Sequence, residues 1–257
     1  MNIVDFPNLN SREEVVSALR GEGFALVPHK LVLDLIEATQ DDANQLNDFW
    51  NNLPEDQYLK DRSKYRRRKH ASLEVVDSKI QIKKHRAHWQ PTTYNALHGG
   101  IQRWFEPIDS NFLLAMPFRK LLTQVTSLAS EIDNCTHWFS EIHQFRIDTT
   151  DGIGRPTPEG AHRDGVDWVA LLLIEKSMVV GGETRVFQIN NTLGRRFTLD
   201  HPWTLLMMDD RRVVHETSPI RPKSEYGWRD TLVITLRSSG FLDEPEHKKI
   251  LDLAPML

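Results

Sequence analysis

The chain has 257 residues, enough for one large domain or two small ones, and its 39% hydrophobic and 26% charged residues are ordinary for a globular protein. The formal net charge of -4 gives no support to a general role in binding nucleic acid or an anionic membrane surface. A single cysteine, Cys135, excludes an intrachain disulfide and favours a cytoplasmic protein, and neither a signal peptide nor a run of ~18 apolar residues indicates secretion or a membrane span.

The N-terminal part of the chain, up to residue 134, is expected to be mostly helical. Ser11 is a typical N-cap for a short helix, and glycines at 21 and 23 end it. A short strand is predicted at 24–27. Apolar residues on one face predict a second helix over 31–53 and a third over 111–132.

Two segments between these helices are harder to interpret. The charge-rich stretch 58–84 is predicted to be a solvated edge strand or loop. An alternative is that one or two of its arginines, such as Arg66 and Arg68, turn inward to hold an anionic group of a substrate. The aromatic stretch 89–109, which includes Trp104, either covers a pocket or belongs to the core.

The residue pattern changes from helical to strand-like after residue 135, where short strands separated by turn residues predict a barrel or jelly roll. The expected strands are 138–147, 168–174, 183–189, 197–199, 203–208, 212–215 and 231–236. We find no linker, so we expect a single domain over 1–257. Its parts are a mostly helical supporting region at 1–134, a β core at 135–240 and a tail at 241–257.

The chemistry-bearing motif is the pair His162 and Asp164, which point to one side of an extended chain. A His-x-Asp triplet alone is weak evidence for a metal site, since many polar strand ends contain one. It directly precedes the most apolar strand, 168–174, and His215 can add a third ligand from another strand. Two histidines and one carboxylate on one face of a metal are typical of non-haem Fe(II) oxygenases. A buried Arg229 would suit a carboxylate of a cosubstrate.

Several segments together match a known family. Residues from about 89 to 237 resemble the bacterial 2-oxoglutarate/Fe(II) dioxygenases that hydroxylate free or N-acylated aliphatic L-amino acids, the isoleucine dioxygenase group. The matching segments are 141–147, 162–165, 179–185, 208–215 and 229–230.

The resemblance implies a mainly β fold with supporting α-helices, a double-stranded β-helix of the jelly-roll, cupin-like kind. It implies that His162, Asp164 and His215 are the metal ligands and catalytic residues, and that Fe(II), 2-oxoglutarate and O2 are required. The expected cosubstrate-binding residues are Arg229, Gln144 and Thr231. Arg146, Arg66, Arg68 and Trp104 are the candidates for contacts with the substrate.

The expected activity is hydroxylation of an aliphatic C–H bond of a free or N-substituted L-amino acid, with release of succinate and CO2. Two alternatives stay open: the same chemistry on another small metabolite or peptide-linked residue, and a cupin-like metal-binding module without turnover. A small-molecule amino acid is the expected partner, nucleic acid and membranes are not, and homo-oligomerisation is left open.

The remaining histidines are not expected to form another site. His143 is predicted to be structural or to support the metal ligands. His70, His85, His88 and His98 show no spacing that resembles a ligand set.

Overall fold

A seven-stranded antiparallel sheet forms the centre of the molecule. The computed structural model describes residues 8–60, 63–95, 97, 99–189 and 194–242. In spatial order the sheet contains β1 (Phe24–Val27), β9 (Leu205–Asp209), β5 (Trp168–Ser177), β12 (Trp228–Arg237), β4 (His137–Asp148), β2 (Arg66–Val76) and β3 (Lys79–Ile82). His98 and residues 243–257 of the predicted tail lie outside the described residues.

Two smaller antiparallel sheets complete the β structure. One contains β10 (Val213–Thr217), β7 (Glu183–Gln188) and β8 (Gly194–Thr198), and the other contains β11 (Ile220–Pro222) and β6 (Val179–Gly181). A large and a small sheet of antiparallel strands form the predicted jelly roll, and the bounds of the predicted strands are confirmed within one residue for β4 and within three residues for β12.

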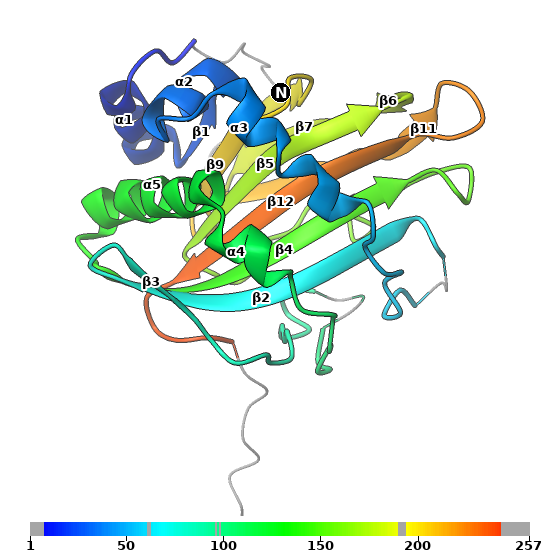
Figure 1. Cartoon of the computed structure of the whole chain (residues 1–257), viewed down its shortest axis with the longest axis horizontal. Helices are drawn as coiled ribbons and strands as arrows, with labels where there is room; N and C mark the ends of the chain where they lie inside the picture. Colours follow the sequence, from blue (N-terminus) through cyan, green and yellow to red (C-terminus); the bar gives the residue numbers. More distant parts are fainter. Residues whose placement is uncertain (1–7, 61–62, 96, 98, 190–193, 243–257) are drawn as a thin grey trace, which may run out of the picture.

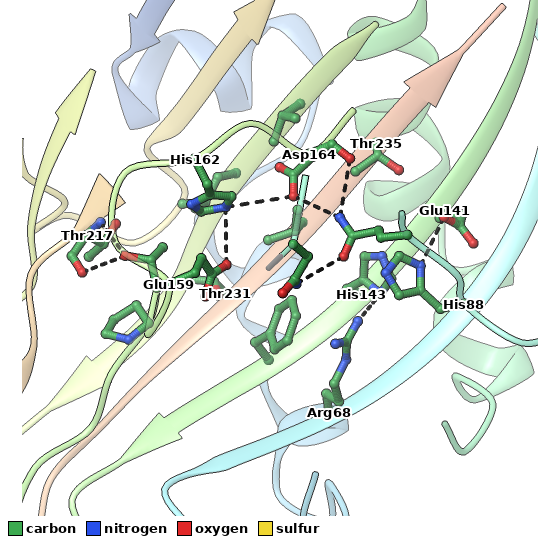
Figure 2. Close-up of a pocket in the computed structure, with 18 of the residues that line it drawn as sticks. Arg68, His88, Glu141, His143, Glu159, His162, Asp164, Thr217, Thr231 and Thr235 are labelled. Atoms are coloured by element: carbon green, nitrogen blue, oxygen red, sulfur yellow. Dashed lines mark hydrogen bonds and ion pairs between the residues drawn. The ribbon is translucent and has the colours of Figure 1, made fainter. Parts of the chain in front are cut away.

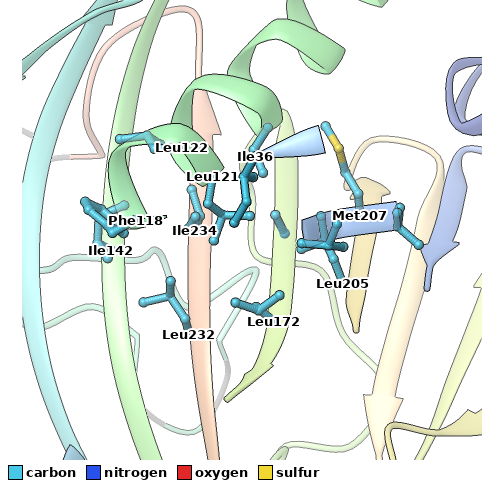
Figure 3. Close-up of a cluster of buried hydrophobic side chains, with 14 of the residues drawn as sticks. Ile36, Phe118, Leu121, Leu122, Ile142, Leu172, Leu205, Met207, Leu232 and Ile234 are labelled. Atoms are coloured by element: carbon cyan, nitrogen blue, oxygen red, sulfur yellow. The ribbon is translucent and has the colours of Figure 1, made fainter. Parts of the chain in front are cut away.

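The helices cover one face of the large sheet (Figure 1). They are α1 (Arg12–Glu22), α2 (His29–Leu35), α3 (Gln40–Asn44), the short helix η1 (Asn47–Trp50), α4 (Ser110–Leu114) and α5 (Met116–Asp133). Figure 3 shows Phe118 and Leu121 of α5 beside Leu232 and Ile234 of β12. Because side chains alternate along a strand, the odd-numbered residues of β12 are left for the other face, where the cavity described below lies.

The predicted helix over 31–53 is wrong, because the chain breaks into α2, α3 and η1. Glu37 has a φ of 48°, a left-handed conformation that a helix cannot accommodate. Thr39 then starts a new helix, accepting a hydrogen bond from the Asp42 N–H while the Asp42 carboxylate accepts one from the Thr39 N–H. The predicted helix over 111–132 is likewise divided, at the extended Ala115, into α4 and α5.

The prediction of a solvated edge strand or loop over 58–84 is confirmed for β3, a mostly exposed strand at the edge of the sheet, and is wrong for β2. The 11-residue strand β2 is an inner strand that pairs with β4 along its whole length. Every second side chain from Arg66 to His70 is buried and turned toward the inside of the jelly roll. The alternative, that arginines of this segment turn inward, is the one that the structure bears out.

Among the described residues, no helix combines the length and the apolar character that crossing a membrane requires.

Candidate active site

His162 and His215 are brought together by backbone pairing. Each donates its N–H to the carbonyl oxygen of the other, with both distances 3.0 Å, and the two rings lie 4.5 Å apart. The Asp164 Oδ1 atom lies 3.8 Å from His162 Nε2, and its Oδ2 atom lies 3.9 Å from His215 Nε2. The three predicted ligands therefore offer two nitrogens and one oxygen to a common point. Figure 2 shows His162 and Asp164 turned toward each other.

The hydrogen bonds and burial of the two histidines suit metal binding. His162 Nδ1 donates to the Gly160 carbonyl oxygen at 2.9 Å, which leaves the lone pair on Nε2 facing Asp164. Burial, with a contribution from His162, lowers the pKa of His215 well below its usual value, so this imidazole stays neutral. Neutral imidazoles and a carboxylate are the donor set that Fe(II) takes in such enzymes, and these residues fit that ion.

A carboxylate that the sequence did not single out holds the loop carrying Asp164. Asp210 accepts hydrogen bonds from the N–H groups of Asp164, Gly165 and Val166 at 2.9, 2.8 and 3.2 Å. Gly165 has a φ of 78°, and a Cβ there would lie 2.3 Å from the Tyr94 ring. The only signal in the sequence was the position of Asp210 directly after the buried strand β9.

Arg229 is a buried cation facing the same cavity. It is 3% exposed, and its Nη2 atom has no hydrogen-bond partner among the described residues. Burial lowers its pKa to about 10, a shift that leaves it charged at neutral pH. Thr231 lines the cavity beside it, as does Thr217 of β10. An unpaired guanidinium in this position fits the distal carboxylate of 2-oxoglutarate.

Two predicted contacts, Gln144 and Arg146, lie on the wrong face of β4. The cavity is lined by odd-numbered residues of this strand, from Glu141 to Ile147, so the even-numbered ones point to the opposite side. Arg146 is bound there to both oxygens of Asp230, at 2.8 and 2.6 Å. Trp104 also lies away from the cavity lining, and is 54% exposed.

The far wall of the cavity is rich in arginine. Arg66 and Arg68 line it, as expected for substrate contacts. Arg66 is paired with Asp56 at 2.8 Å, and Arg68 donates to His143 Nδ1 at 2.8 Å. Arg103, which the sequence did not indicate, is 2% exposed. It donates a hydrogen bond to the neutral Oε1 atom of Gln90, and no carboxylate lies at ion-pair distance from it among the described residues. This wall therefore presents buried positive charge.

Four buried residues form a second cluster that the spacing of the sequence did not predict, and three of them, His88, Glu141 and His143, line the cavity. Glu141 accepts hydrogen bonds from His70 Nε2 at 3.2 Å and from His88 Nδ1 at 3.1 Å, and His143 completes the group. Their ligand atoms lie within 4.8 Å of one another, close enough for a metal. The charges of the buried Arg68 and Arg103 act on Glu141 and make a dication costly there, so we interpret the cluster as a hydrogen-bonded part of the cavity wall.

Apolar side chains line the same cavity as the metal ligands and the arginines. They belong to Val169 and Leu171 of β5 and to Val233 of β12. The site thus combines a metal position, a cation for a cosubstrate, an apolar lining and a cationic wall. That combination suits a small anionic molecule with an aliphatic chain.

Comparisons with known proteins agree with this site. The family model of the 2OG-Fe dioxygenases matches residues 47–235. A solved BsmA homologue from Methylobium petroleophilum PM1 is 42% identical, with 94% of this chain and 98% of that chain covered and a TM-score of 0.88. No match was found among curated proteins.

Two further structures share the fold at lower identity. The protein named IDO from Bacillus thuringiensis is 19% identical, with 90% of this chain and 100% of that chain covered and a TM-score of 0.74. The Fe(II)/α-ketoglutarate-dependent dioxygenase TqaL is also 19% identical, with coverages of 88% and 86% and a TM-score of 0.67.

The family model covers most of the chain, including all three candidate ligands and Arg229. An enzyme that uses Fe(II), 2-oxoglutarate and O2 is therefore supported over a metal-binding module without turnover. The chain belongs to the 2OG-Fe dioxygenase family.

Proposed function

We propose that the protein hydroxylates an aliphatic C–H bond of a small L-amino acid or an N-substituted derivative. The observation that carries this proposal is a single cavity lined by the metal ligands, by the apolar Val169, Leu171 and Val233, and by the buried Arg103. A substrate whose carboxylate is held at the arginine wall would extend its aliphatic chain toward the ligands. The arginines supply charge-assisted hydrogen bonds, and the apolar side chains exclude water from the reacting carbon.

Each residue of the site has a distinct task in this proposal. His162, Asp164 and His215 would hold the iron, and Arg229 would bind the distal carboxylate of 2-oxoglutarate. The bound iron and cosubstrate supply the oxidising chemistry, in which 2-oxoglutarate and O2 yield succinate, CO2 and a hydroxylated product. The protein supplies the position of the C–H bond and a cavity that competing water does not fill.

A substrate screen tests the proposal. The enzyme would be supplied with Fe(II), ascorbate and 2-oxoglutarate, and then with each free L-amino acid or its N-acetyl counterpart. We expect one or more of these compounds to stimulate succinate release and to gain the mass of one oxygen atom. Succinate release that no amino acid or N-acetyl amino acid stimulates, with iron and 2-oxoglutarate shown to be bound, would contradict the proposal.

A further inference from the structure

We propose that Glu159 binds the protonated amine of the substrate, so that the enzyme accepts amino acids with a free amino group and rejects N-acylated ones. This inference rests on the proposed function and decides between the two substrate classes that it leaves open.

Glu159 places a carboxylate inside the cavity without a committed partner. It lies three residues before His162, lines the cavity, and its side chain is 14% exposed. Its Oε2 atom is buried and has no hydrogen-bond partner among the described residues. Its Oε1 atom lies 3.5 Å from His162 Nε2, and Figure 2 shows the side chain turned toward that ring.

The contact with His162 does not neutralise Glu159 in the working enzyme. His162 Nε2 is the atom that faces the metal position, so a metal-bound His162 carries no proton there. In the part of the chain that the structure describes, no lysine or arginine lies within ion-pair distance of Glu159. A buried carboxylate with a free oxygen is costly unless a ligand supplies a donor.

Glu159 shares its cavity with the buried Arg103. Burial lowers the pKa of Arg103, and the carboxylates that oppose this shift are Asp56, Glu141 and Glu159. The cavity therefore contains both a carboxylate and a guanidinium that a substrate can contact.

A free amino acid matches this pair of charges. Its carboxylate can bind the buried guanidinium of Arg103, whose Nε atom has no hydrogen-bond partner among the described residues, and its ammonium group can donate to Glu159. An N-acyl group replaces the ammonium by a neutral amide, which adds bulk beside His162 and leaves the Glu159 carboxylate without a cation. Sites built to bind a charged group discriminate strongly against analogues that lack it.

Glu159 is distinguished from the metal ligands by its placement. The donor atoms of His162, Asp164 and His215 lie within 4.8 Å of one another, whereas Glu159 contacts His162 alone among them. Its substitution should therefore leave metal binding intact, which gives the test a second readout.

The test compares the wild type with Glu159→Gln, which keeps the shape of the side chain and removes its charge. Binding of each free L-amino acid and its N-acetyl counterpart would be measured by calorimetry on anaerobic enzyme loaded with Fe(II) and 2-oxoglutarate. Affinity for Mn²⁺ would be measured separately. Glu216→Gln is the matched control, because Glu216 is next to His215 in sequence but is paired with Arg185, outside this cavity.

We expect the wild type to bind free amino acids in preference to their N-acetyl forms. Glu159→Gln should weaken binding of the preferred amino acid by at least about tenfold, as loss of one partner of a buried charge pair does, with unchanged Mn²⁺ affinity. Glu216→Gln should behave as the wild type does.

Three outcomes would overturn the inference. Preference for N-acetyl amino acids would overturn it while leaving the proposed function intact. Loss of Mn²⁺ affinity in Glu159→Gln would make Glu159 a metal ligand instead. Failure of both compound classes to bind and to stimulate succinate release would overturn the proposed function and this inference together.

Discussion

Two of the three candidate metal ligands, His162 and Asp164, are held by a hydrogen bond with a neighbour, whereas His215 Nδ1 has no such partner among the described residues. The Gly160 carbonyl fixes the His162 ring, and Gln90 donates to Asp164 Oδ1 at 3.4 Å. Gln90 in turn accepts a hydrogen bond from Arg103 at 2.8 Å, so the arginine wall and a metal ligand share one side chain. Such supporting contacts set the orientation of the ligands before the metal binds.

Removal of a ligand should abolish both metal retention and turnover. His162→Ala or Asp164→Ala leaves two protein ligands, too few to hold Fe(II) against exchange. We expect less than about a tenth of the wild-type iron content after desalting. Loss of an outer contact alone lowers metal affinity by about 10–100-fold, and loss of a ligand should lower it at least as much. Metal analysis of the folded variants checks this, and near-normal iron content and activity in either variant would reject the ligand assignment.

Substitution of Arg229 should act on the cosubstrate and not on the metal. Arg229→Gln removes the cation while keeping a hydrogen-bond donor in the cavity. Loss of a buried charge partner costs about 2–5 kcal/mol, so the KM for 2-oxoglutarate should rise by more than about tenfold. Iron content should be unchanged. An unaltered KM would show that another residue binds the distal carboxylate.

At the scale of elements, the loop after β9 and the segment before β5 act as one unit. Asp210 ties the backbone of residues 164–166 to the end of β9, and the positive φ of Gly165 allows the sharp turn that this requires. The loop that carries the ligand Asp164 is thus held by the end of β9, which pairs with β5.

Weakening this connection should loosen the metal site without changing a ligand. Asp210→Asn keeps the size of the side chain but loses part of its capacity to accept three N–H donors. We expect metal affinity to fall by about 10–100-fold, the usual effect of a changed outer contact. Asp167→Asn is the control, because Asp167 accepts hydrogen bonds from Ser238 instead. Equal metal affinities for the two variants would argue against the positioning role of Asp210.

At the scale of the whole molecule, the buried histidines should make stability depend on pH. Burial lowers the pKa of His70, His88 and His143, that of His88 to about 4. In the unfolded chain these histidines have a pKa of about 6.5 and take up protons below that pH, whereas in the folded chain their lowered pKa prevents this. The free energy of unfolding should therefore decrease as the pH falls from about 6.5 toward 4.

Urea unfolding at a series of pH values measures this dependence. Each buried histidine can contribute up to about 1.4 kcal/mol per pH unit. His88→Gln should flatten the slope, while substitution of the exposed His201 should not. A stability that is flat between pH 6.5 and 4.5 would show that these histidines are protonated in the folded protein.

The sequence predicts the features that depend on a local pattern of residues, and it does not predict those that depend on contacts between segments. Regular alternation predicted β4 and β12, and the local spacing of His162 and Asp164 predicted the metal ligands. The inward turn of the β2 arginines was predicted only as an alternative, because these arginines are stabilised by Asp56 and Glu141, which lie outside the strand. The faces of Gln144 and Arg146 depended on the register of β4, and a shift of one residue reverses them.

The roles of Arg103, Glu159 and Asp210 could not be predicted from the sequence for a related reason. Arg103 and Glu159 lie outside the segments that match a known family, Asp210 lies in the segment 208–215 without a role assigned to it, and each gains its role only when the fold brings it beside the cavity or the ligand loop. The single-domain organisation, the cytoplasmic location and the oligomeric state stay predictions.

The central claim, hydroxylation of an amino acid coupled to 2-oxoglutarate, is tested most directly by mass spectrometry under isotopically labelled dioxygen. The screened amino acid that best stimulates succinate release should gain one labelled oxygen atom, with product and succinate formed in equal amounts. An amino acid that remains unlabelled and unmodified while succinate accumulates would contradict the account.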